Sequence, residues 1–262
     1  MKNLIICKNM LGQKRKANYI NKFNFIDKTY NKAYTKDVNN LYMNLFNLYR
    51  KNIKKNNNIV IGGDHSLAIS TLSSTIMKYG PNNKIIWIDA HCDVNSQKAS
   101  VSKNVHGMVL NYILKLHSYN RNQYNLFVPS RKINTENIMY LGIRHIDAYE
   151  KEILEKYSIK YILSNEINNN TERCINKINN FLHKSKYHLS IDIDGLSPNY
   201  VPCTGTPVEK GIELNALIKI LKNIRQHNIL NTDIVEYNPS LGNIRQQYTT
   251  QNTINKILKC FN

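Results

Sequence analysis

Five short clusters of histidine and acidic residues are spread along the chain, and their side chains are of the kinds that bind divalent metal ions. Carboxylate and imidazole ligands together suit Mn²⁺, Zn²⁺ or Fe²⁺, so the clusters could close around one pair of metal ions. They are Gly62-Gly63-Asp64-His65-Ser66, Asp89-Ala90-His91-Cys92-Asp93, His106-Gly107, Asp192-Ile193-Asp194-Gly195 and Val235-Glu236-Tyr237-Asn238-Pro239.

In two of these clusters the candidate ligands alternate with other residues. Residues i, i+2 and i+4 of a strand share one face. The alternation therefore predicts that Asp89, His91 and Asp93 point the same way, and that Asp192 and Asp194 do too. The same alternation turns Cys92 to the opposite face, which does not favour a metal role for its thiol.

Short β-branched runs lead into the polar clusters and predict buried strands. Strands alternating with helices predict a parallel sheet covered on both faces. Such sheets bind ligands at the carboxyl ends of their strands, which is where the clusters fall. The strands are predicted at residues 4–7, 58–61, 84–88, 137–141, 161–163, 187–193 and 229–237. The helices are predicted at 37–51, 66–79, 109–116, 148–157, 171–184, 213–227 and 249–260.

The composition limits the classes to which the protein can belong. A chain of 262 residues with 42% hydrophobic residues can form one large domain, and no linker or repeat divides it. The formal charge of +18 raises a nucleic-acid hypothesis. The lysines, however, are scattered among asparagines, as at 51–56, a pattern typical of an AT-rich genome. Specific nucleic-acid binding is therefore not favoured, while weak attraction of an anion or RNA stays open.

The cysteines and the N-terminal residues bear on the compartment. Five cysteines are an odd number without motif spacing, which indicates a reducing compartment rather than a disulfide framework. The apolar run 4–7 is too short for a signal peptide or a membrane span. We therefore expect a cytoplasmic protein that makes no use of a membrane.

Three segments together resemble the signatures of the ureohydrolase family, and within it those of the arginases. They are Gly62-Gly63-Asp64-His65-Ser66, Trp87-Ile88-Asp89-Ala90-His91-Cys92-Asp93 and Ser190-Ile191-Asp192-Ile193-Asp194-Gly195-Leu196. The resemblance covers residues 58–262, and residues 1–57 form a shortened and divergent N-terminal region. It implies a three-layer αβα sandwich with a mostly parallel central sheet, two Mn²⁺ per subunit and a homotrimer. One arginase-like domain over residues 1–262 is expected.

The resemblance also implies a role for each matching residue. One metal would be held by His65, Asp89, Asp93 and Asp192, and the other by Asp89, His91, Asp192 and Asp194. Asp93 would hold the metal-bridging hydroxide, and His106 would pass a proton to the leaving amino group. Glu236 would pair with the substrate guanidinium. The implied activity is that of a hydrolase of linear amidines, which converts L-arginine into L-ornithine and urea.

Further matches concern the α-amino-acid end of the substrate. Asn95 and Ser102 match positions that bind the α-carboxylate, and Asp147, with Glu150 nearby, matches the α-amino contact. Thr206 matches a pocket position. Two other functions stay open: an agmatinase or other guanidino-hydrolase, and an inactive metal-binding homologue with weak nucleic-acid affinity. The chain departs from the family pattern at Ser197-Pro198, Arg144-His145 and Lys210-Gly211, and none of these is an implied metal ligand.

Overall fold

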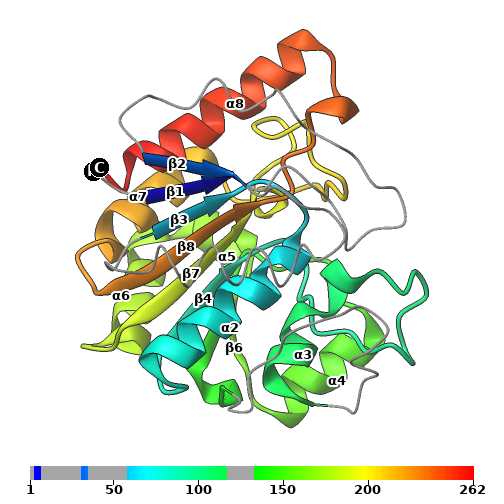
Figure 1. Ribbon diagram of the computed structural model, residues 1–262, viewed down its shortest axis with the longest axis vertical. Coiled ribbons are helices and arrows are strands. Elements are labelled where there is room, and N and C mark those ends of the chain that lie inside the picture. Colours follow the sequence, from blue (N-terminus) through cyan, green and yellow to red (C-terminus); the bar gives the residue numbers. More distant parts are fainter. Residues whose placement is uncertain (1–2, 7–30, 35–57, 117–132) are drawn as a thin grey trace.

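The described strands of the computed structural model lie in one sheet, and every described strand pairing is parallel (Figure 1). The structure describes residues 3–6, 31–34, 58–116 and 133–262, so the predicted helix 37–51 lies outside the described residues. The order across the sheet is β2-β1-β3-β8-β7-β4-β5-β6. The strands are β1 (Asn3–Ile6), β2 (Asn31–Tyr34), β3 (Asn58–Ile61), β4 (Lys84–Ile88), β5 (Ile138–Leu141), β6 (Lys160–Ile162), β7 (Tyr187–Asp192) and β8 (Ile229–Val235).

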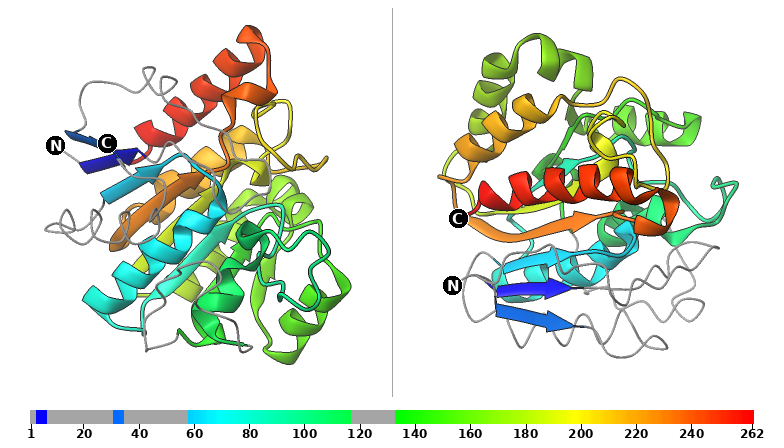
Figure 2. Two further views of the ribbon diagram at one scale, coloured as in Figure 1. Left: turned by 45° about the vertical axis from the view of Figure 1, so that its right-hand side comes forward. Right: turned by 90° about the horizontal axis from the view of Figure 1, so that it is seen from above.

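Helices cover both faces of this sheet, which confirms the predicted three-layer α/β fold (Figure 2). Helices α2, α3 and α4 bury apolar side chains against one face, and α5, α6, α7 and α8 against the other. The helices are α2 (Ala68–Tyr79), α3 (Val109–Leu114), α4 (Ala148–Lys156), α5 (Ser164–Asn169), α6 (Thr171–Leu182), α7 (Leu214–Ile224) and α8 (Ile244–Lys259).

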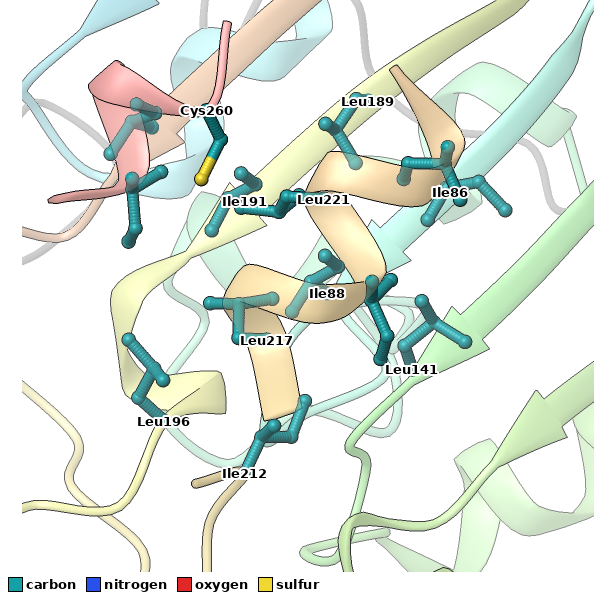
Figure 3. Close-up of a cluster of buried hydrophobic side chains, with 14 of the residues drawn as sticks. Ile86, Ile88, Leu141, Leu189, Ile191, Leu196, Ile212, Leu217, Leu221 and Cys260 are labelled. Atoms are coloured by element: carbon teal, nitrogen blue, oxygen red, sulfur yellow. The ribbon is translucent and has the colours of Figure 1, made fainter. Parts of the chain in front are cut away.

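Strand β4 shows why its residues must be apolar on both sides. Ile85 and Trp87 belong to the core under α2 and α3, while Ile86 and Ile88 belong to the core under α7. Figure 3 shows Leu221 of α7 beside this second set. Full burial of each such side chain contributes about 1.5–3 kcal/mol. A strand buried on both faces therefore needs a continuous apolar run, as in Lys84–Ile88.

The structure differs from the sequence expectation at three elements. Helix α8 begins at Ile244 rather than at residue 249, because Asn243 and Gln246 form a reciprocal capping box at its start. Strand β2 and helix α5 were not predicted. Neither has the pattern that signals its type: β2 reads Asn-Lys-Ala-Tyr, and α5 buries only Ser164 and Ile167.

The loop before α7 packs closely on the segment after β7. A Cβ on Gly211 would lie 2.2 Å from the carbonyl carbon of Leu196, so only glycine fits there. The neighbouring Lys210 has a φ of 60°, in the left-handed region that a side chain disfavours. The sequence departure at Lys210-Gly211 therefore places backbone strain at Lys210.

We expect Lys210→Gly to raise the free energy of unfolding by about 1 kcal/mol and Tm by about 3 °C, because glycine adopts this backbone conformation without strain. Thermal unfolding followed by circular dichroism measures both. Lys151→Gly is the matched control: its side chain is also exposed, but it lies inside α4, where glycine costs about 1 kcal/mol. A lower Tm for Lys210→Gly would contradict the strain at this position.

Candidate functional site

The carboxyl ends of four neighbouring central strands, β3, β8, β7 and β4, meet at one edge of the sheet and carry the predicted polar clusters. His65 follows β3 and begins the 3-10 turn η1 (His65–Leu67). Asp89 follows β4, Asp192 ends β7, and Glu236 follows β8. Parallel strands thus bring together side chains that lie up to 171 residues apart in the sequence.

Three carboxylates surround one nitrogen of His65. Its Nδ1 lies 3.1 Å from Asp89 Oδ2, 3.0 Å from Asp93 Oδ2 and 3.3 Å from Asp192 Oδ2. His65, Asp89 and Asp93 each offer a ligand atom within 4.8 Å of the others. Because all these side chains are buried, the group has the donor types and the spacing of a metal site.

A second group shares Asp89 with the first. His91 Nδ1 lies 3.5 Å from Asp89 Oδ1 and 3.2 Å from Asp194 Oδ2. These three residues also offer ligand atoms within 4.8 Å of one another. Asp89 therefore faces one group with Oδ2 and the other with Oδ1, as a carboxylate between two metal ions would. The structure brings all six candidate ligands together.

The side chains do not converge in the way that the alternation predicted. Strand β4 ends at Ile88, so Asp89, His91 and Asp93 lie in the loop after it rather than on one face of a strand. Asp93 and Glu236 have φ values of 49° and 65°. Left-handed backbone at non-glycine residues costs about 1–3 kcal/mol each and is concentrated at functional sites.

The charges of the cluster do not balance without a cation. Burial and the repulsion of Asp89 raise the pKa of Asp93 to about 6. Burial, Asp194 and Asp89 likewise raise the pKa of Asp192 well above its usual value. Burial would also raise the pKa of Asp89, but the imidazoles of His65 and His91 beside it lower its pKa instead. Divalent cations would keep all these carboxylates ionised.

The hydrogen bonds of His65 test whether the donor set fits a metal. Its Nε2 lies 2.8 Å from Ser190 Oγ, while its buried Nδ1 makes no hydrogen bond of good geometry to the carboxylates around it. With the proton on Nε2, the Nδ1 lone pair points at the carboxylate group. A metal-binding imidazole has this arrangement, so the residues present fit a pair of divalent metal ions.

Two residues without a role in the sequence analysis support the candidate ligands. Trp87 Nε1 donates to Asp89 Oδ2 at 2.9 Å, and the Trp87 ring stacks on His65 with centroids 4.0 Å apart. Ser190 contacts His65 from β7. Each lies two residues before a candidate ligand, Asp89 or Asp192. Extending the alternation backwards into the strands would have found both.

We expect Ser190→Ala to weaken metal affinity about 10- to 100-fold, because His65 loses the partner that fixes its ring and tautomer. Calorimetric titration of the metal-free protein with Mn²⁺ measures this. Ser74→Ala is the matched control, since Ser74 Oγ bonds only the Ser70 carbonyl within α2. Equal affinities of the two variants would show that Ser190 does not orient His65.

His106 and Glu236 form a pair beside the cluster. His106 lies in the turn η2 (Val105–Met108), and its Nδ1 is 3.2 Å from Glu236 Oε1, which also accepts from the His65 backbone N–H at 2.9 Å. Burial alone would lower the pKa of His106, but the Glu236 carboxylate raises it to about 9. His106 is therefore held protonated at neutral pH in the metal-free protein.

A cavity of about 320 Å³ opens beside the candidate metal ligands. His91, Asp93, Asp192 and His106 line it, while Glu236, which contacts His106, is not among its lining residues. All five other predicted substrate contacts line the cavity: Asn95, Ser102, Asp147, Glu150 and Thr206. The structure thus places the candidate substrate residues and the candidate ligands around one space.

The five substrate candidates differ in what they contact. Asn95 Nδ2 donates to Asp147 Oδ2 at 2.8 Å, and Thr206 Oγ1 donates to Asp194 Oδ2 at 3.0 Å. Glu150 is buried and accepts from the backbone N–H groups of Val94 and Asp147. Both acids line the cavity, and Asp147 is the more exposed of the two.

Two features outside the cluster bear on the other sequence expectations. The four described cysteines, Cys92, Cys174, Cys203 and Cys260, are free and buried, and Cys7 lies outside the described residues. Cys92 packs in the apolar core under α2, and neither metal group includes its thiol. Within the described ranges, no helix combines the length and the apolarity that a membrane crossing needs.

The parallel sheet and the paired His/Asp groups at its carboxyl edge define an α/β protein with a candidate two-metal centre. A sequence model of the Arginase family matches residues 7–261, and the chain belongs to this family. It is 36% identical to the arginase of Plasmodium falciparum over 233 residues and 36% identical to human arginase-1 over 219 residues. These matches cover 83% and 80% of the chain, but 56% and 68% of the two relatives.

Solved arginase structures share the fold over the whole chain. The arginase of Entamoeba histolytica, in complex with L-ornithine, superposes with a TM-score of 0.83 at 26% identity and covers 100% of this chain and 99% of that one. Arginase from Bacillus subtilis gives a TM-score of 0.84 at 28% identity, with 100% and 98% covered. These likenesses agree with the family membership.

Proposed function

We propose that the chain hydrolyses L-arginine to L-ornithine and urea with two Mn²⁺ per subunit. The observation that carries the proposal is the pair of His/Asp groups that share Asp89 at the base of a cavity with polar groups at its rim. The curated relatives named arginase and the ornithine complex of the Entamoeba arginase support it. The proposed ligands are His65, Asp89, His91, Asp93, Asp192 and Asp194.

A pair of divalent ions lowers the pKa of a water towards neutrality and so supplies a nucleophile at working pH. The chain's own residues then position the reactants. Asp93 faces the cavity with a carboxylate that can accept a hydrogen bond from the nucleophile. His106 also faces the cavity, and in the metal-free protein Glu236 raises its pKa to about 9. We place the leaving amino group beside His106, which donates the proton that this group needs.

The guanidinium of the substrate is planar and cationic, and it needs a carboxylate partner. Glu236 supplies a buried carboxylate at the inner end of the site. Its Oε1 contacts His106 in this structure, so pairing with the substrate requires His106 to turn from that oxygen. The pairing would orient the guanidinium carbon towards the nucleophile.

The rim of the cavity distinguishes arginine from agmatine, which has no α-carboxylate. We propose that Asn95 and Ser102 bind the α-carboxylate and Asp147 the α-amino group, with Thr206 steadying Asp194 from the pocket wall. Hydrogen bonds to a charged group contribute about 1.5–3 kcal/mol each. Several such bonds together favour arginine over agmatine by at least about 100-fold in kcat/KM.

We expect Asp147→Asn to lower kcat/KM for L-arginine about five- to tenfold, a modest effect because this carboxylate is exposed. Turnover of agmatine should fall by a similar factor, since agmatine lacks the α-carboxylate but keeps the amino group that Asp147 is proposed to bind. Urea release from both substrates measures this. Glu155→Gln, an exposed carboxylate elsewhere on α4, is the control. Comparable turnover of the two substrates by the unchanged protein would replace arginine by a broader guanidino specificity.

The subunit arrangement, the compartment and the domain boundary follow from the same proposal. We propose a homotrimer of one arginase-like domain in the cytoplasm, from the family membership and from the free cysteines of the described residues. Analytical ultracentrifugation measures the assembly, and a sedimenting species of about three subunit masses is the expected result.

A further inference from the structure

The guanidinium of Arg144 is bound entirely by backbone carbonyl groups. Nη2 donates to the Val208, Asp194 and Leu196 carbonyls at 2.7, 2.8 and 3.3 Å. Nη1 donates to the Gly142 and Gly195 carbonyls at 3.0 and 3.2 Å, and Nε donates to the Glu209 carbonyl at 2.9 Å. Among the described residues, no carboxylate forms an ion pair with Arg144.

These carbonyls belong to three loops that come together around Arg144. One follows β5 and leads to Asp147, the second follows β7 and contains Asp194, and the third runs from Thr206 towards α7. Each loop therefore carries a residue of the candidate site. The separations between Arg144 and its partners in the second and third loops are 50 to 65 residues.

The side chain of Asp194 depends on the same three-loop junction. Its Oδ1 accepts from the Ala90 backbone N–H at 3.1 Å, and its Oδ2 accepts from Thr206 Oγ1 at 3.0 Å. Arg144 holds the carbonyl of Asp194 and, two residues after Thr206, the carbonyl of Val208. Both the backbone of Asp194 and the loop that contacts its carboxylate are thus fixed by one guanidinium.

We propose that Arg144 is a positioning residue that fixes Asp194, and with it the His91–Asp194 half of the metal centre. This inference rests on the proposed function only in taking that centre as the site to be held. A lysine cannot replace Arg144, because an ammonium offers three donors at one point while a guanidinium offers five in a plane. Removing the guanidinium leaves the three loops without their shared donor.

Loss of the Arg144 guanidinium should weaken metal binding more in one half of the centre than in the other. In Arg144→Met, affinity at the His91–Asp194 half should fall about 10- to 100-fold, as for loss of a residue that supports a metal ligand. The His65–Asp93 half has its own supports in Ser190 and Trp87. Its affinity should stay within about threefold of the unchanged protein.

The experiment titrates the metal-free full-length chain with Mn²⁺ and follows free Mn²⁺ by electron paramagnetic resonance. The unchanged chain should bind two ions, and Arg144→Met one ion tightly and one weakly. Asp194→Asn weakens the same half of the centre. The variant with both Arg144→Met and Asp194→Asn should therefore bind the second ion little more weakly than either single variant. Arg225→Met is the matched control, because Arg225 also donates to backbone carbonyls, those of Cys260 and Asn262, away from the site.

Unchanged binding of both ions by Arg144→Met would overturn the proposal, as would equal weakening of both halves. An unchanged chain that binds only one ion would overturn it too. If Arg144→Met does not fold, Arg144→Lys replaces it. A second ion bound at least about fivefold more weakly supports the proposal, and binding equal to the unchanged chain overturns it. If the unchanged chain binds two ions but releases no urea, the proposed function fails while this test still stands.

Discussion

Asp89→Asn should remove both metal ions and lower urea release from L-arginine by at least about 10³-fold. Asp89 is the residue common to both ligand groups, facing His65 with one oxygen and His91 with the other. An amide keeps the size of the side chain but offers one oxygen and no negative charge. Each group then loses one carboxylate ligand and one of the negative charges that hold a divalent ion.

Metal content by mass spectrometry and urea release are measured on the same sample of this variant. Glu152→Gln, an exposed carboxylate on α4, is the control and should bind two ions as the unchanged chain does. Circular dichroism confirms that both variants are folded. Two ions retained by folded Asp89→Asn would refute the assignment of Asp89 as the shared ligand.

Glu236→Gln should lower kcat/KM for L-arginine about 10²- to 10³-fold, chiefly through a higher KM, while both metal ions stay bound. The carboxylate is buried, and a buried charge partner of a guanidinium contributes about 2–5 kcal/mol. The substitution also removes the charge that keeps His106 protonated. In the metal-free protein the pKa of His106 should therefore fall from about 9 towards about 6.5.

Steady-state kinetics give the change in KM, and an NMR titration of the histidine rings gives the change in pKa. At pH 7.5 His106 should be mostly protonated in the unchanged metal-free chain and mostly neutral in Glu236→Gln. A lower pKa with unchanged KM would show that Glu236 only holds His106. An unchanged kcat/KM would exclude a role for Glu236 in the reaction.

The central strands were predictable because their signal is local. The predicted strands 58–61 and 84–88 coincide with β3 and β4, since a β-branched or aromatic run buried on both faces differs sharply from the polar loops around it. Strand β2 and helix α5 carry no such run. Their type is fixed by neighbours in the sheet and in the helical layer, which a local pattern does not record.

The candidate ligands were predictable from residue type and family signature, but the contacts that their supporting residues make were not. Ser190 was quoted within a signature, and its contact with His65 joins residues 125 positions apart. Arg144 binds only backbone carbonyls, and carbonyls carry no sequence signal. Glu150 was expected to share the role of Asp147; it lines the same cavity, and its carboxylate also accepts from two backbone N–H groups that the sequence does not indicate.

The most direct test follows L-arginine labelled in its guanidino carbon with the metal-free chain and with the same chain after two equivalents of Mn²⁺. We expect labelled urea and ornithine in equal amounts from the loaded chain only, and loss of both products when a chelator removes the metal. Two bound ions per chain without urea would contradict arginine hydrolysis. Urea from the metal-free chain at the same rate would contradict a role for the His/Asp centre.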